Sequence, residues 1–433
     1  MSKLSMFLMS WLVVPVMAQP SARQWNAEVT AGWNLGNQLE CTSQDGESVA
    51  LTCDANHMQA ETAWGNPVVT QQTLQAVKDA GFNAVRIPVR WQNHITDAET
   101  MAVSEDWMTR VKEVVGYALD LGMKVIINVH HDKWLESRPT YQYKGENNTR
   151  LSLLWTQIAN AFKDYDYQLA FAGTNEVHIP DNWNAPSTEN LTVQNSYNQT
   201  FVDAVRATGG NNLKRHLVVQ TYACDPDFGM NGNFIVPTDI EGNNYDYMSV
   251  EFHYYKPYEY CGGKAASEGG FYFWGRAYSS YGNTSPSNET TMRNAFQQVA
   301  DTWGSLGLGV IIGEWGISDH WLQADKVTIH ENMTYYCKTL VTEARKRGIA
   351  TFVWDNNVFG NGMEKFGIFD RKNNMQLAAD WTVSGIMQGI VTEIGEFSRN
   401  KEQKTMQPRK FFRNGRLLIQ KDGKVYTLQG CEN

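Results

Sequence analysis

The chain has 433 residues, of which 42% are hydrophobic, 12% aromatic and 19% charged. This composition excludes a disordered or fibrous protein and predicts a large buried core. The net charge of -9 leaves no excess of cations for phosphate groups, so we expect no nucleic-acid partner. The 15 Trp, 19 Tyr and 18 Phe exceed what a core usually needs, and their flat rings suit a ligand with apolar faces and hydroxylated edges.

The first 18 residues have the pattern of a secretory signal peptide. Lys3 precedes an apolar run over residues 7–17, and Ala18 ends a short segment suited to cleavage. We therefore expect a secreted or cell-surface protein, the alternative being a buried helix that begins at residue 1. This run is too short to span a bilayer and no later stretch approaches the required length of about 18 apolar residues, so we expect no membrane span.

Export would place the six cysteines in an oxidising compartment, where thiols commonly pair. Cys41 and Cys53 share one polar loop, while Cys224 and Cys261 each follow an apolar run. We expect disulfides Cys41–Cys53 and Cys224–Cys261.

Eight short apolar runs alternate with amphipathic segments along residues 19–397. The runs cover 32–37, 84–89, 124–130, 169–176, 216–222, 248–255, 310–315 and 351–354, and the main helical patterns cover 71–80, 106–121, 153–162, 193–207, 292–303 and 333–347. Eight βα units predict an α/β fold, a (β/α)8 TIM barrel with loop insertions. The alternative is a doubly wound open sheet, but no glycine-rich phosphate loop follows the first run.

The C-terminal segment differs from the rest of the chain. Residues 398–408 are polar and predict a linker, and two hairpin-type turns, at Asn414-Gly415 and Asp422-Gly423, predict a small three-strand meander within residues 409–433. This tail resembles the C-terminal sorting segments of secreted proteins of the Bacteroidetes lineage. Alternatively, the tail packs on the barrel.

Polar residues end the apolar runs, where a barrel of this kind places its active site. They are Arg86, His130, His131, Asn175, Glu176, His253, Tyr255, Glu314 and Trp354. Strand alternation predicts that Glu251, His253 and Tyr255 share one face, and that Ile312 shares a face with Glu314. Each residue alone has a structural explanation, such as a satisfied core histidine. Together, ionisable groups ending five buried runs indicate one site, because buried charge is costly unless paired.

Glu176 and Glu314 end the fourth and seventh runs, so we expect them to face each other at the mouth of the barrel. One protonated carboxyl and one carboxylate are what glycoside hydrolysis with retention requires, at a separation of about 5–5.5 Å. We expect Arg86 and Tyr255 to keep Glu314 ionised, and the apolar neighbours of Glu176 to favour its protonated form.

Five motifs in order resemble glycoside hydrolase family 5, over about residues 25–395. They are residues 84–91 (AVRIPVRW), 128–131 (NVHH), 174–176 (TNE), 252–255 (FHYY) and 313–316 (GEWG), and the opening 32–37 (GWNLGN) is similar to the bacterial endoglucanase branch. Val177 stands where the family pattern usually has Pro. The resemblance implies that Glu314 is the nucleophile, Glu176 the acid/base and Asn175 the partner of the sugar 2-hydroxyl. It further implies a supporting and substrate-binding set of Arg86, His130, His131, His253, Tyr255, Asn37 and the platform Trp354.

The expected function is that of a secreted, retaining endo-β-glycanase that hydrolyses internal β-1,4 linkages of cellulose or related β-glucans. A xyloglucanase, a β-mannanase and a non-catalytic carbohydrate-binding barrel are the alternatives. Three loops, over 40–62, 134–143 and 255–274, are expected to line the cleft, their Trp and Tyr serving either as sugar-stacking surfaces or as loop anchors. The expected partner is a β-linked polysaccharide, and the protein is expected to be a monomer.

A metal enzyme is the competing catalytic class, because His130, His131, His253 and the two glutamates are possible zinc or iron ligands. The sequence has no HExxH motif and no paired CxxC spacing. We therefore expect no metal and no cofactor.

Overall fold

The computed structural model describes residues 19–43, 49–53, 56–391, 409–413, 416–421 and 424–427, the last three segments as backbone only. The predicted signal peptide (1–18) and linker (398–408) lie outside the described residues.

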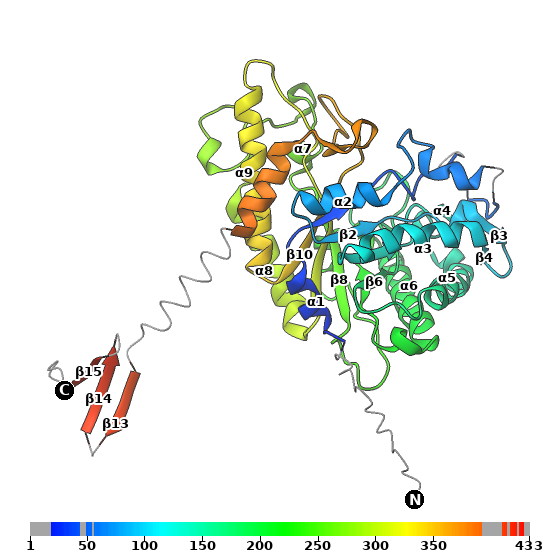
Figure 1. The fold of residues 1–433 in the computed structure, drawn as a ribbon, viewed down its shortest axis with the longest axis horizontal. Helices are drawn as coiled ribbons and strands as arrows, with labels where there is room; N and C mark the ends of the chain where they lie inside the picture. The colour runs from blue at the N-terminus through cyan, green and yellow to red at the C-terminus, as the bar shows by residue number, and fades with distance from the viewer. Residues whose placement is uncertain are drawn as a thin grey trace, which may run out of the picture.

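Eight parallel strands form a closed barrel (Figure 1). They are β1 (Gly32–Asn34), β2 (Ala84–Ile87), β5 (Lys124–Asn128), β6 (Leu169–Ala172), β7 (Leu217–Gln220), β8 (Met248–Tyr254), β9 (Gly309–Trp315) and β10 (Ile349–Val353). The order around the ring is β1-β10-β9-β8-β7-β6-β5-β2. Each strand lies in a predicted apolar run or overlaps it, so the (β/α)8 barrel is confirmed, and the closed ring excludes the open sheet.

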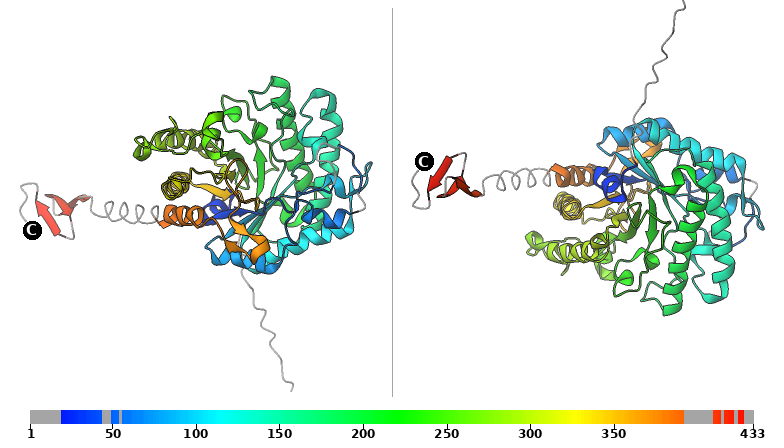
Figure 2. Two further views of the ribbon diagram at one scale, coloured as in Figure 1. Left: turned by 90° about the horizontal axis from the view of Figure 1, so that it is seen from above. Right: turned by 90° about the horizontal axis from the view of Figure 1, so that it is seen from below.

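Helices lie outside the strands (Figures 1 and 2). They are α1 (Ala22–Glu28), α2 (Gln71–Asp79), α3 (Glu105–Asp120), α4 (Lys133–Glu136), α5 (Tyr141–Ala161), α6 (Thr188–Ala207), α7 (Tyr258–Cys261), α8 (Glu289–Thr302), α9 (Lys326–Arg345) and a helical stretch over 380–391. Helices α5 and α6 begin earlier than their hydrophobic patterns predict. A capping box of Ser187 and Asn190 fixes the start of α6.

The core has two layers, because alternate strand residues point to opposite sides of the barrel wall. A small inner cluster fills the barrel with side chains from alternate strand positions, Ala84, Ile126, Ala170, Ala172, Val218, Ile311, Ala350 and Phe352. A larger outer cluster holds the intervening residues, including Val85, Ile127 and Val219, together with the buried faces of the helices. The continuous burial of each strand follows from this two-sided packing.

Helix α1 closes the amino-terminal end of the barrel. Its Trp25 belongs to the inner cluster, and Asn26 Nδ2 donates to the backbone O of Val310 and to Ser249 Oγ, each at 3.2 Å. The carboxyl end of the ring is therefore the open end.

Strand β9 contains an irregularity that places Glu314. Phe252 of β8 pairs with Ile312, but the next residue, His253, pairs with Glu314, so Gly313 is an extra residue in β9. Ile311 packs inside the barrel and Ile312 outside it. The predicted shared face of Ile312 and Glu314 is therefore wrong, because the bulge reverses the alternation just before the glutamate.

Four short strands and a C-terminal meander complete the described chain. Two small hairpins pair β3 (Ile95–Asp97) with β4 (Ala102–Val103), and β11 (Phe369–Asp370) with β12 (Gln376–Leu377). Strands β13 (Arg409–Arg413), β14 (Arg416–Lys421) and β15 (Lys424–Thr427) form an antiparallel sheet, so the predicted meander is confirmed. Among the described residues, no helix combines the length and the apolar character needed to cross a membrane.

The cysteines do not pair as predicted. Cys224 Sγ donates to the backbone O of Asn175 (3.4 Å), whereas Cys261 Sγ packs at 3.3 Å from the hydroxyl of Tyr336 on α9. The predicted Cys224–Cys261 disulfide is wrong, because the two thiols face different neighbours. Cys41 is also a buried free thiol, so the predicted Cys41–Cys53 bond is not formed.

Candidate active site

A cavity of about 600 Å³ opens at the carboxyl ends of the strands. Eight predicted site residues line it: His130, His131, Asn175, Glu176, His253, Tyr255, Glu314 and Trp354. Arg86 is fully buried, in contact with Glu314, and Asn37 is not among the lining residues. The structure therefore brings the predicted residues together, with the exception of Asn37.

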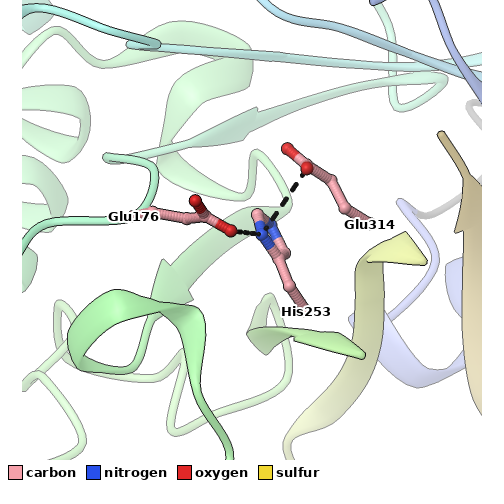
Figure 3. A group of neighbouring side chains, drawn as sticks. All are labelled: Glu176, His253 and Glu314. Atoms are coloured by element: carbon pink, nitrogen blue, oxygen red, sulfur yellow. Dashed lines mark hydrogen bonds and ion pairs between the residues drawn. The ribbon is translucent and has the colours of Figure 1, made fainter. Parts of the chain in front are cut away.

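His253 lies between the two glutamates (Figure 3). Its Nδ1 is 2.6 Å from Glu176 Oε1 and 3.7 Å from Glu314 Oε2. One carboxylate oxygen of Glu176, one of Glu314 and one ring nitrogen of His253 all lie within 4.8 Å of one another. In the ring, β7 and β8 separate β6 from β9, so a side chain at the end of β8 can reach both carboxylates.

The buried Arg86 holds side chains of the site in place by hydrogen bonds. Its Nη1 donates to Glu314 Oε1 (2.9 Å) and to Asn34 Oδ1 (3.0 Å), and its Nη2 donates to Asn175 Oδ1 (2.8 Å). The phenol of Tyr255 donates to the other oxygen of Glu314 at 3.2 Å. The expected contacts of Arg86 and Tyr255 with Glu314 are thus present.

Glu251 is a third carboxylate close to the site, and it was not among the predicted site residues. It is fully buried on β8, 3.0 Å from Arg86 Nε, and accepts a hydrogen bond from Gln220 Nε2 at 2.7 Å. Burial raises the pKa of Glu251, but the charges of Arg86 and His253 outweigh it and lower that pKa to about 2. The alternation of Glu251 with His253 was the available signal, since both point into the barrel.

The environments of the two cavity glutamates differ from the prediction. The side chain of Glu314 is 7% exposed and that of Glu176 22%. Burial raises the pKa of Glu314 above its usual range, and the positive charges of His253 and Arg86 oppose this rise. Glu314 is therefore the more deeply buried carboxyl of the two, and burial counts against the ionised form that was expected for it.

His253 and His130 carry different charges. Burial lowers the pKa of His253, but Cys224, Glu314 and Glu176 raise it well above the usual range, so the ring is protonated. Burial lowers the pKa of His130 well below its usual range, and the neighbouring His131 adds to this effect. Of these two histidines, His253 next to the glutamates therefore favours the charged form and His130 the neutral form.

Asn175, His130 and Trp354 form a further wall of the cavity. The rings of His130 and Trp354 are parallel within 7°, with centroids 6.0 Å apart. Asn175 Nδ2 lies 3.5 Å from His130 Nε2, while its amide oxygen is held by Arg86. An amide fixed at one end and a flat indole ring that line the same cavity can bind a sugar hydroxyl and a sugar face.

Asn37 and His131 occupy left-handed backbone positions, with φ of 55° and 60°. The backbone N of Asn37 donates to the Glu40 carboxylate, and its backbone O accepts from Asn66 Nδ2 at 2.5 Å. The backbone N of His131 donates to Glu136 Oε2 at 2.9 Å. The described contacts of Asn37 are therefore those of a turn residue, whereas His131 also lines the cavity.

The loop after β7 stabilises the Asn175 segment. Ala223 and Cys224 have φ of 53° and 49°, which costs about 1–3 kcal/mol per residue without a glycine. The backbone N of Ala223 donates to Val177 O (3.0 Å), and Cys224 Sγ donates to Asn175 O. Both residues line the cavity, so the strained turn fixes the backbone on either side of Glu176.

The predicted cleft loops contain both anchors and lining residues. Trp134 and Trp274 are fully buried, so they are anchors, whereas Tyr255 and Tyr258 line the cavity. Trp183, on the loop after β6, is 58% exposed and also lines the cavity, and the sequence reading missed it. An isolated Trp in a polar segment was the only available signal.

Glu176, His253 and Glu314 are the one group of potential metal ligands in the described chain. Their polar atoms already have partners, since His253 contacts Glu176 and Arg86 donates to Glu314. A divalent cation there would lie close to the Arg86 guanidinium and the protonated His253. The donor set therefore fits a hydrogen-bonded carboxylate pair better than a metal centre.

Comparison with known proteins identifies the family. The model for cellulases, glycosyl hydrolase family 5, matches residues 43–360. The chain belongs to glycoside hydrolase family 5. Endoglucanase B of Clostridium cellulovorans is 35% identical over 380 residues, which cover 87% of this chain and 76% of that protein. The resemblance that the motifs indicated is confirmed.

Solved structures agree with this assignment. A broad-specificity endoglucanase from Ruminococcus champanellensis with bound cellotriose is 33% identical, with a TM-score of 0.73 and coverage of 86% of this chain and 99% of that one. A family 5 xyloglucanase from Bacteroides ovatus in complex with an XXXG heptasaccharide is 33% identical, with a TM-score of 0.75 and coverage of 87% and 78%. The family 5 protein described here is a glycoside hydrolase of the endo-1,4-β-glucanase type.

Proposed function

We propose that this enzyme hydrolyses internal β-1,4 linkages of β-glucans outside the cell, with retention of the anomeric configuration. The observation that carries the proposal is the close approach of the Glu176 and Glu314 carboxylates, whose nearest oxygens lie within 4.8 Å of each other. Retaining glycosidases separate their two carboxyl groups by about 5–5.5 Å, whereas inverting enzymes need about 6.5–9.5 Å to admit a water.

In the first step, Glu314 attacks the anomeric carbon and forms a covalent ester with the sugar. The glycosidic C–O bond breaks, and Glu176 transfers its proton to the departing oxygen. Arg86 and Tyr255, which bind the two oxygens of Glu314, orient the attacking carboxylate. Asn175 is placed to bind the 2-hydroxyl of the reacting sugar, with its amide oxygen held by Arg86.

In the second step, a water replaces the leaving sugar. Glu176, now a carboxylate, removes a proton from this water, and the resulting oxygen attacks the anomeric carbon and releases Glu314. The protonated His253, 2.6 Å from Glu176, stabilises the negative charge that Glu176 carries between the two steps. Apart from the substrate and this water, neither step needs a redox partner or a group from outside the chain.

The preferred substrate is an unsubstituted or mixed-linkage β-glucan, and xyloglucan is the second candidate. The bound cellotriose of the Ruminococcus relative supports the first, and the heptasaccharide of the Bacteroides relative supports the second. The exposed Trp183 and the Trp354 platform offer aromatic surfaces for sugar rings with or without side chains. Secretion after cleavage of residues 1–18 would bring the enzyme to such polymers.

Proton NMR of the earliest product tests the mechanism. The β-anomer should appear first, and the α-anomer as the first product would contradict retention. Glu314→Ala and Glu176→Ala should each lower hydrolysis by several orders of magnitude, and azide should rescue Glu314→Ala on an activated aryl glycoside to an α-glycosyl azide. Wild-type turnover in either variant would refute the assigned roles. Barley β-glucan, carboxymethyl cellulose, xyloglucan and glucomannan, compared in parallel, would rank the substrates.

A further inference from the structure

The cavity contains a carboxylate that the proposed mechanism does not use. Glu364 lies on the loop after β10 and lines the cavity together with Glu176 and Glu314. Its Oε1 accepts a hydrogen bond from the phenol of Tyr258 at 3.2 Å. Tyr258 is 40% exposed and lines the same cavity, so an acidic group and an aromatic ring face the substrate space side by side.

The backbone around Glu364 is held in place. Glu364 has φ of 58°, in the left-handed region, and its carbonyl O accepts from Asn356 Nδ2 at 3.1 Å. The next backbone N, of Lys365, donates to Ser318 Oγ at 2.7 Å. A non-glycine residue fixed in this conformation at a cavity wall is typical of a functional position.

Tyr258 is fixed as well. A Cβ built on Gly262 would lie 2.8 Å from Cζ of Tyr258, so the ring packs directly on the Gly262 backbone. The Lys264 ammonium lies 5.4 Å from the ring centroid. The pair is therefore organised before a ligand arrives.

Contacts through the loop after β7 link the pair to the segment that carries Glu176. Glu364 comes from the loop after β10, yet it bonds to Tyr258 in the loop after β8, so its segment passes over β9. The loop after β8 is joined to the loop after β7 by the ion pair of Lys256 with Asp225 (2.9 Å). Partial burial raises the pKa of Glu364, the Tyr258 hydrogen bond lowers it, and the Glu176 carboxylate raises it.

We infer that Glu364 and Tyr258 bind the sugar on the leaving-group side of the cleaved bond. This inference rests on the proposed function, in which Glu176 protonates the oxygen of that sugar. The carboxylate of Glu364 has lone pairs left after the Tyr258 bond and accepts hydrogen bonds from two adjacent hydroxyls. The exposed ring of Tyr258 contacts the apolar face of the same sugar.

Two substrates that differ only in the leaving group provide the test. Cellopentaose places glucose units on the leaving-group side, whereas p-nitrophenyl β-cellobioside places an aryl group there. Glu364→Gln, which removes a charge-assisted contact, and Tyr258→Ala, which removes the stacking ring, should each lower kcat/KM on cellopentaose about tenfold. The loss on the aryl cellobioside should be at least about fivefold smaller. Glu268→Gln, exposed on the same loop as Tyr258, is the matched control and should change neither value.

Each alternative result has a separate meaning. Equal losses on both substrates would overturn the leaving-group assignment, and no loss on either would show that the pair does not bind substrate. If the wild-type enzyme cleaves neither compound, the proposed function itself fails. Circular dichroism of the variants should match the wild type, since both side chains face the cavity and neither belongs to the buried core.

Discussion

At the scale of single residues, His253 and His130, two of the three histidines that line the cavity, differ in charge. His253 is protonated because carboxylates surround it, and its charge opposes the rise that burial causes in the pKa of Glu314. His130 is buried among cationic neighbours and stays neutral. Of these two histidines, only His253 therefore acts together with Arg86 to favour the ionised form of Glu314.

This difference predicts a shift in the pH profile. The proposed mechanism needs an ionised Glu314, so activity falls as the pH drops through the raised pKa of Glu314. His253→Gln removes the largest opposing charge, raises that pKa further, and should move the acid limb of kcat/KM to higher pH by about one unit. His130→Gln should lower the rate without moving the acid limb. Matching shifts in both variants would contradict the assigned charges.

Glu251 is predicted to contribute to stability. Its pKa is about 2 in the folded protein and 4.5 in the unfolded chain, so its contribution is complete above pH 4.5 and is lost as the pH falls toward 2. Glu251→Gln leaves the buried Arg86 without a full counter-charge and should lower the free energy of unfolding at neutral pH by about 3 kcal/mol. Urea unfolding at several pH values should show the wild type and the variant converging below pH 4.5. A constant difference down to pH 2.5 would contradict the pairing.

At the scale of elements, the bulge in β9 decides which face Glu314 takes. Regular alternation after Ile311 would turn the glutamate toward the helices, and the extra Gly313 brings it back to the cavity. The same glycine leaves room for Glu251, because a Cβ on Gly313 would lie 1.7 Å from Glu251 Oε1. Because Gly313 has no side chain, the carboxylates of both Glu314 and Glu251 fit on the inner side of the barrel wall.

Gly313→Ala should therefore impair both activity and folding stability. The added methyl group must displace Glu251 or the strand, and we expect kcat to fall at least about tenfold, with destabilisation of about 1–3 kcal/mol. Gly116→Ala in α3 is the matched control, since its Cβ would meet nothing within 4 Å. That variant should keep full activity and gain about 0.5–1 kcal/mol in stability, from helix propensity. Thermal melts and initial rates of the two variants would settle the comparison.

The strands were predictable from the sequence, and their irregularities were not. Buried parallel strands appear as continuous apolar runs, and the ionisable residues that end them had to gather at one rim. The Gly313 bulge depends on how β9 pairs with β8, which no local pattern specifies. Trp183 and Glu364 lie in loops positioned by distant contacts, such as the bond between Glu364 and Tyr258, 106 residues apart. The role of Trp134 stayed open between sugar stacking and loop anchoring, because a buried anchor and an exposed stacking ring have the same sequence signature.

At the scale of the whole molecule, one polypeptide supplies the barrel, the cavity and its ion pairs. The proposed reaction uses these side chains, the substrate and water. The side chains of Glu176, His253 and Glu314 are the group in the described chain that most resembles a metal site, and their charges already pair with one another. We expect hydrolysis to be unchanged after dialysis against EDTA, and added Zn²⁺ to inhibit by competing with the proton of His253 for the carboxylates. Loss of activity in EDTA that zinc or manganese restores would contradict this prediction.

Helix α1 at the base of the barrel also has a consequence for the order of folding. Residues of the helix and its C-terminal cap, Val29, bond to partners that the ribosome makes far later, as in the contact of Asn26 with Val310, 284 positions downstream, and that of Arg345 with Val29, 316 positions away. Helix α1 can therefore dock only when β8, β9 and α9 exist. Because such distant contacts carry a large loop-closure entropy, the ring should close late and in one cooperative event. The barrel would then remain unclosed until synthesis of the chain is nearly complete.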